Sequence, residues 1–147
     1  MFIAGPGSGN PKKNIGGSTA AAWVAQTYLD DLRLGVDRVY WYYWYPQANL
    51  VGVQMFDGTP GAAGYQTVST WLTGSYYSCT TDKVNTCQLG DNTNPKVIAW
   101  ASKGSGTFVV PAGANWTCDA LNQCQPAVPG TPVTIGSMPQ WFGIAPS

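Results

Sequence analysis

Histidine and glutamate are absent from this chain of 147 residues. Histidine is the usual general base, proton shuttle and metal ligand near neutral pH, so these roles would fall to other side chains. All acidic residues are aspartates, at positions 30, 31, 37, 57, 82, 91 and 119. Only Asp30 and Asp31 are neighbours, and adjacent helical residues point about 100° apart, which favours a solvated face over a catalytic pair. The sequence therefore indicates no catalytic residue, no metal site and no cofactor.

Charge is scarce as well, since charged residues make up 10% of the chain and the formal net charge is zero. Soluble domains usually contain about 25% charged residues. A chain without excess positive charge lacks the electrostatic footprint that binds nucleic acid or an anionic membrane, so we expect neither partner. Gly, Thr, Ser, Asn, Tyr and Trp are common instead, as in many extracellular β-rich and carbohydrate-handling proteins.

A leader for export is not recognisable, because the first residues (MFIAGP) contain neither a basic n-region nor an apolar h-region. Yet four cysteines, Cys79, Cys87, Cys118 and Cys124, occur in the spacings C-x7-C and C-x5-C, which fit no zinc knuckle. Of the three possible disulfide connectivities, 79–87 with 118–124 is the best, since each pair closes a short loop. Disulfides indicate an oxidising, extracytoplasmic compartment, so we expect the true N-terminus to be missing.

The first half of the chain has the pattern of an α/β fold. Apolar residues recur at helical spacing over 18–34, and a second helix is expected over 61–73. Between them, Val36–Trp44 is dense in Val, Tyr and Trp, which favours a strand buried on both faces. One strand and two helices cannot close a core, so we expect part of this fold to be missing.

From Ser75 the pattern changes to short strands separated by Gly- and Pro-containing turns. This pattern is typical of a small antiparallel β-sandwich whose hairpins or strand ends are clamped by the two disulfides. We therefore predict two domains, 1–74 and 75–147. The expected strands are Tyr76–Thr80, Thr86–Leu89, Lys96–Ala101, Thr107–Val110, Asn115–Asp119, Pro132–Ile135 and Trp141–Ile144.

Six consecutive aromatic residues, Tyr40 to Tyr45, allow three interpretations. A membrane span is not expected, although Val39–Phe56 carries no charge, because Pro, Gln and Asn interrupt that run. Packing against helices and a sheet is favoured for most of the rings. Trp44, at the carboxyl end of the expected strand, is the candidate platform for stacking of a sugar ring, together with Tyr42.

The order of several motifs supports a resemblance. These motifs are G-P-G, A-A-x-V-A-Q-T-Y-L-D-x-L-R-L-G-V-D-R-V-Y-W-Y-x-W, G-Y-Q-T-V-S-T-W-L-T-G-S, I-A-W-A-S-K-G-S-G-T-F-V-V-P and P-V-T-I-G-S-M-P. Together they resemble the C-terminal part of a secreted (β/α)8-barrel glycoside hydrolase of the retaining, GH39/GH5-like kind. The resemblance implies an α/β plus all-β chain: a C-terminal fragment of a TIM barrel followed by the β-sandwich. Residues 19–34 would be its helix 7, Val36–Trp44 its strand 8 and 61–73 its helix 8.

The same resemblance implies hydrolysis of O-glycosidic bonds by a secreted parent protein, with carbohydrate and the missing N-terminal barrel portion as partners. Retaining hydrolysis needs two carboxylates roughly 5 Å apart. In these families both are glutamates, so neither role transfers to any residue here, and we expect the chain alone to be inactive. Active sites of such barrels lie at the carboxyl ends of the strands, where Trp44 would contact sugar.

A different class of function is the alternative: a non-catalytic carbohydrate-binding or surface-interaction module. It would use Trp44 with Tyr42 or Tyr45 as a stacking surface without chemistry, and Trp116 and Trp141 in the second half could serve similarly. Single Trp residues in small sandwiches are more often part of the core. A purely structural or interaction protein is the third possibility, based on the Gly- and Thr-rich second half.

Overall fold

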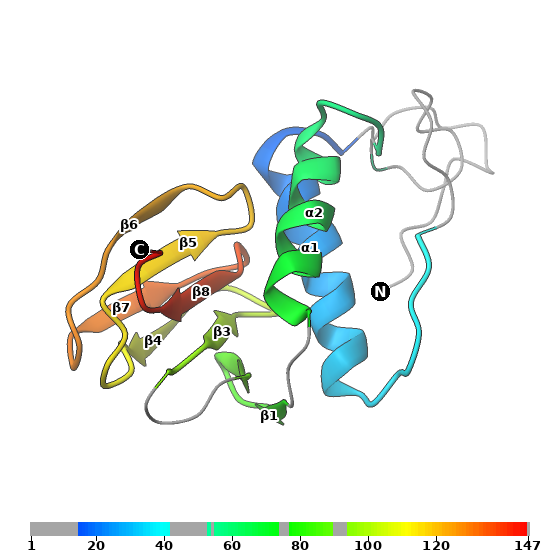
Figure 1. Ribbon diagram of the computed structural model, residues 1–147. Coiled ribbons are helices and arrows are strands. Elements are labelled where there is room, and N and C mark those ends of the chain that lie inside the picture. Colours follow the sequence, from blue (N-terminus) through cyan, green and yellow to red (C-terminus); the bar gives the residue numbers. More distant parts are fainter. Residues whose placement is uncertain (1–14, 42–52, 54, 74–76, 90–93, 147) are drawn as a thin grey trace.

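The computed structural model describes residues 15–41, 53, 55–73, 77–89 and 94–146. Within them, a pair of helices packs beside a six-stranded antiparallel sheet, and a separate two-stranded sheet completes the fold (Figure 1). The elements are α1 (Gly17–Arg33), α2 (Pro60–Leu72), β1 (Ser78–Thr80), β2 (Asn85–Gln88), β3 (Val97–Trp100), β4 (Gly106–Val109), β5 (Trp116–Asp119), β6 (Cys124–Pro126), β7 (Pro132–Ile135) and β8 (Gln140–Gly143).

Local signals in the sequence explain where the helices begin and end. Gly35 follows α1 in the left-handed conformation (φ 75°), as expected for a glycine that terminates a helix. At the start of α2, the Thr59 hydroxyl accepts a hydrogen bond from the Ala62 N–H (3.3 Å), and Pro60 occupies the first turn. The two helices approach closely at Gly64, which has no side chain. A Cβ at this position would lie 2.6 Å from the Ala21 carbonyl oxygen, too close for any other residue.

The six-stranded sheet has the order β1-β2-β3-β8-β5-β6, and all its pairs are antiparallel. One of its faces packs on the helices. The register places one row of residues across all six strands on that face: Cys79, Cys87, Ile98, Trp141, Cys118 and Cys124. Most of this row joins a core with Leu29 of α1 and Val68 of α2. The helices and the sheet therefore share one hydrophobic core.

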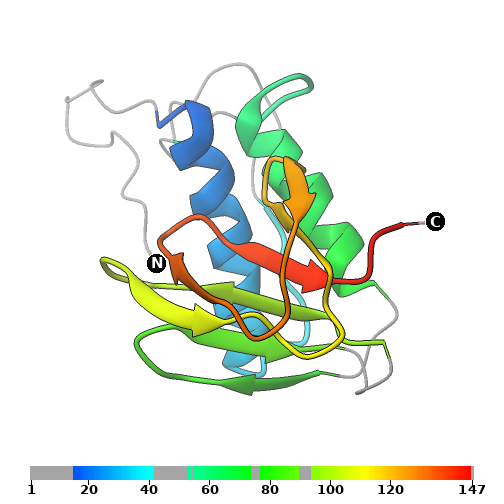
Figure 2. The same ribbon diagram turned by 90° about the vertical axis from the view of Figure 1, so that its left-hand side faces the viewer.

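The opposite face of the sheet is covered in part by the two-stranded sheet of β4 and β7. Phe142 of β8 is 1% exposed and contacts Phe108 of β4, with ring centroids 5.2 Å apart. Ala99 of β3 and Ile135 of β7 belong to the same buried cluster. Figure 2 shows the strands with the helix pair behind them.

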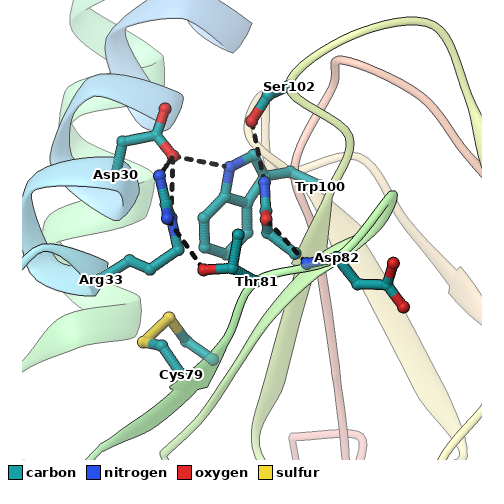
Figure 3. Close-up of polar contacts among 9 residues, drawn as sticks. Asp30, Arg33, Cys79, Thr81, Asp82, Trp100 and Ser102 are labelled. Atoms are coloured by element: carbon teal, nitrogen blue, oxygen red, sulfur yellow. Dashed lines mark hydrogen bonds and ion pairs between the residues drawn. A yellow bond between two sulfur atoms is a disulfide. The ribbon is translucent and has the colours of Figure 1, made fainter.

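Polar contacts also join α1 to the sheet, as Figure 3 shows. The Asp30 carboxylate accepts a hydrogen bond from the indole N–H of Trp100 (3.3 Å) and forms an ion pair with Arg33 (3.3 Å). Arg33 in turn donates to the Thr81 hydroxyl (2.9 Å). Trp100 is fully buried, so its N–H needs such a partner. Asp30 therefore has a structural role at this junction.

The predicted α/β fold with a TIM-barrel fragment is wrong. The described residues form a mainly β fold with antiparallel sheets and two helices, and residues 36–41 form no strand. Trp41 instead packs its ring on Tyr28 of α1, with centroids 6.5 Å apart. Strand propensity reflects how a side chain fits a half-buried surface, and here packing on the helices supplies that surface without a backbone ladder.

The predicted positions of the two helices and of the strands after residue 75 agree with the structure. Both helices lie within two residues of their predicted bounds, and the seven expected strands of the second half are present with ends that differ by at most two residues. The short strand β6 was not predicted. The division into domains 1–74 and 75–147 stays a prediction, beside the observation that one core spans both parts. Among the described helices, none is long and apolar enough to cross a membrane.

Candidate functional site

The two residues predicted to bind sugar, Trp44 and Tyr42, lie outside the described residues, so their role stays a prediction. Only the first two residues of the aromatic run, Tyr40 and Trp41, are among the described residues, and their environments differ. Tyr40 is 79% exposed, whereas Trp41 is half-buried against the helices. Trp116 and Trp141 are partly buried and pack on the core shared by the helices and the sheet. The described aromatic residues thus favour packing over an open stacking platform.

Tyr28 is the centre of the packed aromatic cluster on the helices. Its ring stacks on Trp41 and meets the edge of Tyr65, with centroids 5.4 Å apart for the latter pair. Burial raises the pKa of Tyr28 to about 12, the neighbouring Tyr65 adds to the increase, and a backbone hydrogen bond with Trp41 opposes it. The phenol is therefore neutral at physiological pH, and nothing in this cluster suits it to exchange protons in a reaction.

Both predicted disulfides are confirmed, Cys79–Cys87 and Cys118–Cys124. Each joins residues that are directly paired across neighbouring strands. We call residues 78–88 the first stapled hairpin and residues 116–126 the second stapled hairpin. Two such bonds are compatible with an extracytoplasmic protein, because thiols are kept reduced in most cytosolic compartments.

The turn of the second stapled hairpin is held by its own polar groups. One carboxylate oxygen of Asp119, Oδ1, accepts hydrogen bonds from the N–H groups of Leu121 (2.8 Å) and Gln123 (2.9 Å). The Asp119 N–H donates to the Gln123 carbonyl (3.0 Å), and Asn122 adopts the left-handed conformation (φ 59°) that asparagine tolerates. The Asn122 N–H also donates to the Asp119 carbonyl (2.9 Å), so a disulfide and four hydrogen bonds order a turn of a few residues.

A concavity of about 310 Å³ lies beside this hairpin. Its lining is Thr117, Asp119, Gln123, Cys124, Gln125 and Gln140, and we call it the glutamine concavity. The register explains how these residues meet: Thr117 on β5 faces Gln125 on β6, and Asp119 faces Gln140 on β8. They share the face of the sheet that carries Phe142, but the β4–β7 sheet covers only the apolar part of that face.

The chemistry of this lining is that of a hydrogen-bonding site. Each glutamine amide offers a carbonyl acceptor and two N–H donors, and the Asp119 carboxylate is an acceptor. Its second oxygen, Oδ2, has no hydrogen-bond partner in the described part of the chain. A lone carboxylate cannot provide the acid and the nucleophile of a retaining glycosidase. Groups of three or more potential metal ligands do not occur among the described residues either.

A second concavity, of about 300 Å³, lies on the other side of the same hairpin, against α2. It is lined by Ala63, Gln66, Thr67, Thr70, Trp71, Leu121 and Asn122. Trp71 is only 9% exposed, so little of its indole face is available for stacking. The glutamine concavity, with its denser set of polar side chains, is the stronger candidate.

Reasoning from the sequence assigned no binding role to Thr117, Asp119, Gln125 or Gln140. Three of these residues adjoin a cysteine in the sequence: Thr117 and Asp119 are next to Cys118, and Gln125 is next to Cys124. Polar residues that alternate with the paired cysteines were therefore a signal available in the sequence. The participation of Gln140 depends on the pairing of β5 with β8, which no local pattern reveals. Comparison with models of protein families, with curated proteins and with solved structures finds no match, so a function has to be argued from the geometry.

Proposed function

We propose that the chain is a non-catalytic carbohydrate-binding module that belongs to an extracellular glycoside hydrolase. The observation that carries the proposal is the glutamine concavity, an open hollow lined by three glutamine amides, a carboxylate and a hydroxyl. Sugars present many hydroxyl groups that donate and accept at once, and amide side chains satisfy both demands. The backbone of the hairpin is ordered before binding, so only side-chain rotamers have to adjust to a ligand.

The acidic residues support a binding role over a catalytic one. Asp30 pairs with Arg33 and Trp100, and Asp119 organises its own turn. Asp82 accepts a hydrogen bond from the N–H of Lys83 (2.6 Å). The chain contains no His, the most common general acid or base, and no Glu, so the glutamate pair of a retaining glycosidase does not fit it. The two disulfides support an extracellular location.

Isothermal titration with neutral oligosaccharides (cellohexaose, xylohexaose and mannohexaose) tests the proposal. The wild-type chain should bind at least one of them with a saturable isotherm. In the double variant Gln125→Ala/Gln140→Ala, loss of two hydrogen-bonding amides should raise Kd about 10- to 100-fold, at about 0.5–1.5 kcal/mol for each hydrogen bond.

Gln66→Ala is the matched control, since it removes the same side chain from the other side of the hairpin. It should leave Kd within about twofold of the wild-type value. Absence of binding to all three sugars, or equal losses in the control and the double variant, would contradict the proposal. Release of reducing sugar by the purified wild-type chain would contradict its non-catalytic part.

A further inference from the structure

The Thr117 hydroxyl is a buried polar group without a partner. Thr117 is 7% exposed, and its Oγ1 atom is buried and makes no hydrogen bond to any described residue. A buried hydroxyl left unpaired costs about 1–3 kcal/mol, so nearly all such groups in proteins are paired with protein, water or ligand. Valine has almost the same shape and would fill this position without that cost. The hydroxyl is therefore better explained by a partner that arrives from outside the protein.

Thr117 is also part of the lining of the glutamine concavity. Gln125 lies directly opposite on β6, a strand at the edge of the sheet, and its side chain is exposed. Exposed side chains change rotamer within nanoseconds, so rotation of Gln125 can uncover the hydroxyl. Across β5 from it, the pair Asp119–Gln140 forms the neighbouring part of the same surface. Once Gln125 has rotated away, a group entering the concavity can reach both the hydroxyl and the carboxylate, because Thr117 and Asp119 lie two residues apart on the same face of β5.

The negative charge of Asp119 in the lining limits the kinds of ligand that can bind. Asp119 is the only charged residue in the lining, and the two hydrogen bonds within its turn both go to Oδ1, not to Oδ2. A ligand carboxylate or sulfate would face this like charge with no Lys or Arg in the lining to offset it. A ligand hydroxyl, by contrast, can donate to Asp119, while an adjacent hydroxyl donates to or accepts from Thr117.

We infer, as an extension of the proposed function, that the glutamine concavity recognises an uncharged sugar residue through two adjacent hydroxyl groups, one bound by Thr117 and one by Asp119. Thr117 is then a specificity-determining residue. The site selects neutral sugars and discriminates against uronic acids and sulfated sugars.

The variants Thr117→Val and Thr117→Ser test this inference. Valine keeps the shape and removes the hydroxyl, so Kd for the neutral hexasaccharide that binds should rise about tenfold, equivalent to about 1.4 kcal/mol. The melting temperature of the free protein should stay the same or increase, because the valine leaves no buried polar group unpaired. Serine keeps the hydroxyl and should retain Kd within about threefold. Hexagalacturonate, the anionic probe, should bind at least tenfold more weakly than the neutral sugar.

The outcomes separate this inference from the function on which it rests. If Gln125→Ala/Gln140→Ala weakens sugar binding but Thr117→Val does not, the proposed function stands and the role of Thr117 is refuted. A lower melting temperature for Thr117→Val would show that the hydroxyl is already satisfied in the free protein, and would also refute it. Equal binding of hexagalacturonate and the neutral sugar removes the selectivity. If the wild type binds no sugar, both proposals fail.

Discussion

The first and the second stapled hairpin each join two neighbouring strands through a disulfide between directly paired cysteines. They lie at opposite ends of the same six-stranded sheet. The first is attached to the helices: Thr81 accepts a hydrogen bond from Arg33, and Cys87 is completely buried in the shared core. The second is ordered by hydrogen bonds to Asp119 within its own turn, contributes Cys118 to the same core and borders two concavities. The first also borders a concavity of about 300 Å³, but that lining contains no glutamine.

This difference shows that a stapled hairpin has no function by itself. The disulfide and the strand pairing provide local order in both cases, and the surroundings decide how that order is used. At the first hairpin, the hydrogen bond from Arg33 and the burial of Cys87 make this order part of the junction with the helices. At the second hairpin, the ordered turn borders the glutamine concavity, and rigid scaffolds of this kind commonly position binding loops.

Removal of each disulfide in turn should separate its contribution to stability from its contribution to sugar binding, and we expect the largest effects here. Cys79→Ala/Cys87→Ala should lower the free energy of unfolding by about 3–4 kcal/mol, since it adds loss of buried packing by Cys87 to the loop-entropy term. Cys118→Ala/Cys124→Ala, in which Cys118 is 8% exposed in the same core, should lower it by about 2–3 kcal/mol and weaken sugar binding about tenfold or more, because the turn loses its order. Urea denaturation and isothermal titration measure both quantities.

Each double variant serves as the control for the other. The first-hairpin variant, measured at a temperature where it is folded, should bind sugar with Kd within about threefold of wild type. Equal stability losses together with equal binding losses in the two variants would show that the hairpins have no separate roles.

Substitution of Asp30 should disrupt the polar contacts between α1 and the six-stranded sheet, with the next largest loss of stability. Asp30→Ala leaves the buried indole N–H of Trp100 without its acceptor and removes the ion pair with Arg33, so we expect a loss of about 2 kcal/mol in the free energy of unfolding. Asp31→Ala is the matched control at the adjacent helical position and should change stability by less than about 0.5 kcal/mol. Chemical denaturation at neutral pH measures both, and equal losses would refute the structural role of Asp30.

Substitution of Asn122 tests the conformation of the turn in the second stapled hairpin, with a smaller expected effect on stability. Its left-handed conformation disfavours residues with a Cβ that lack a short polar side chain, so Asn122→Ala should cost about 1 kcal/mol. Asn122→Gly should stay within about 0.5 kcal/mol of wild type, since glycine adopts this conformation freely. Thermal unfolding followed by circular dichroism gives the comparison. An alanine variant as stable as the glycine variant would indicate that this turn is not held in the conformation described.

Much of the secondary structure could be predicted because its signals are local. Gly35 and Thr59 mark helix ends, and the cysteine spacings lead to the two disulfides found. The strand predicted over Val36–Trp44 was wrong in its described part because strand formation depends on a partner strand, whereas Trp41 packs on a helix. In the described part of the run, Trp41 packs on the helices and Tyr40 is exposed, so the aromatic density there marks neither a strand nor uniform burial.

The candidate site could not be predicted, because its residues carry weak signals individually. Thr117, Asp119 and Gln125 belong to one hairpin and are related by alternation along its strands, which the sequence pattern can suggest. Gln140 joins them only because β8 inserts between β3 and β5 in the sheet. That strand order depends on contacts between distant segments, whose energies no short window of sequence contains.

The sequence by itself determined the oxidised cysteine pairs, the limits of the helices and the lack of a Glu or His for catalysis, since each follows from residue identity or from neighbours along the chain. Tertiary structure alone decided which face of the sheet is covered. The helices cover one face, and β4 and β7 cover the apolar part of the other because only that part gains from burial. The polar remainder, around Asp119, Gln125 and Gln140, is left open, and for this reason it is the candidate binding site.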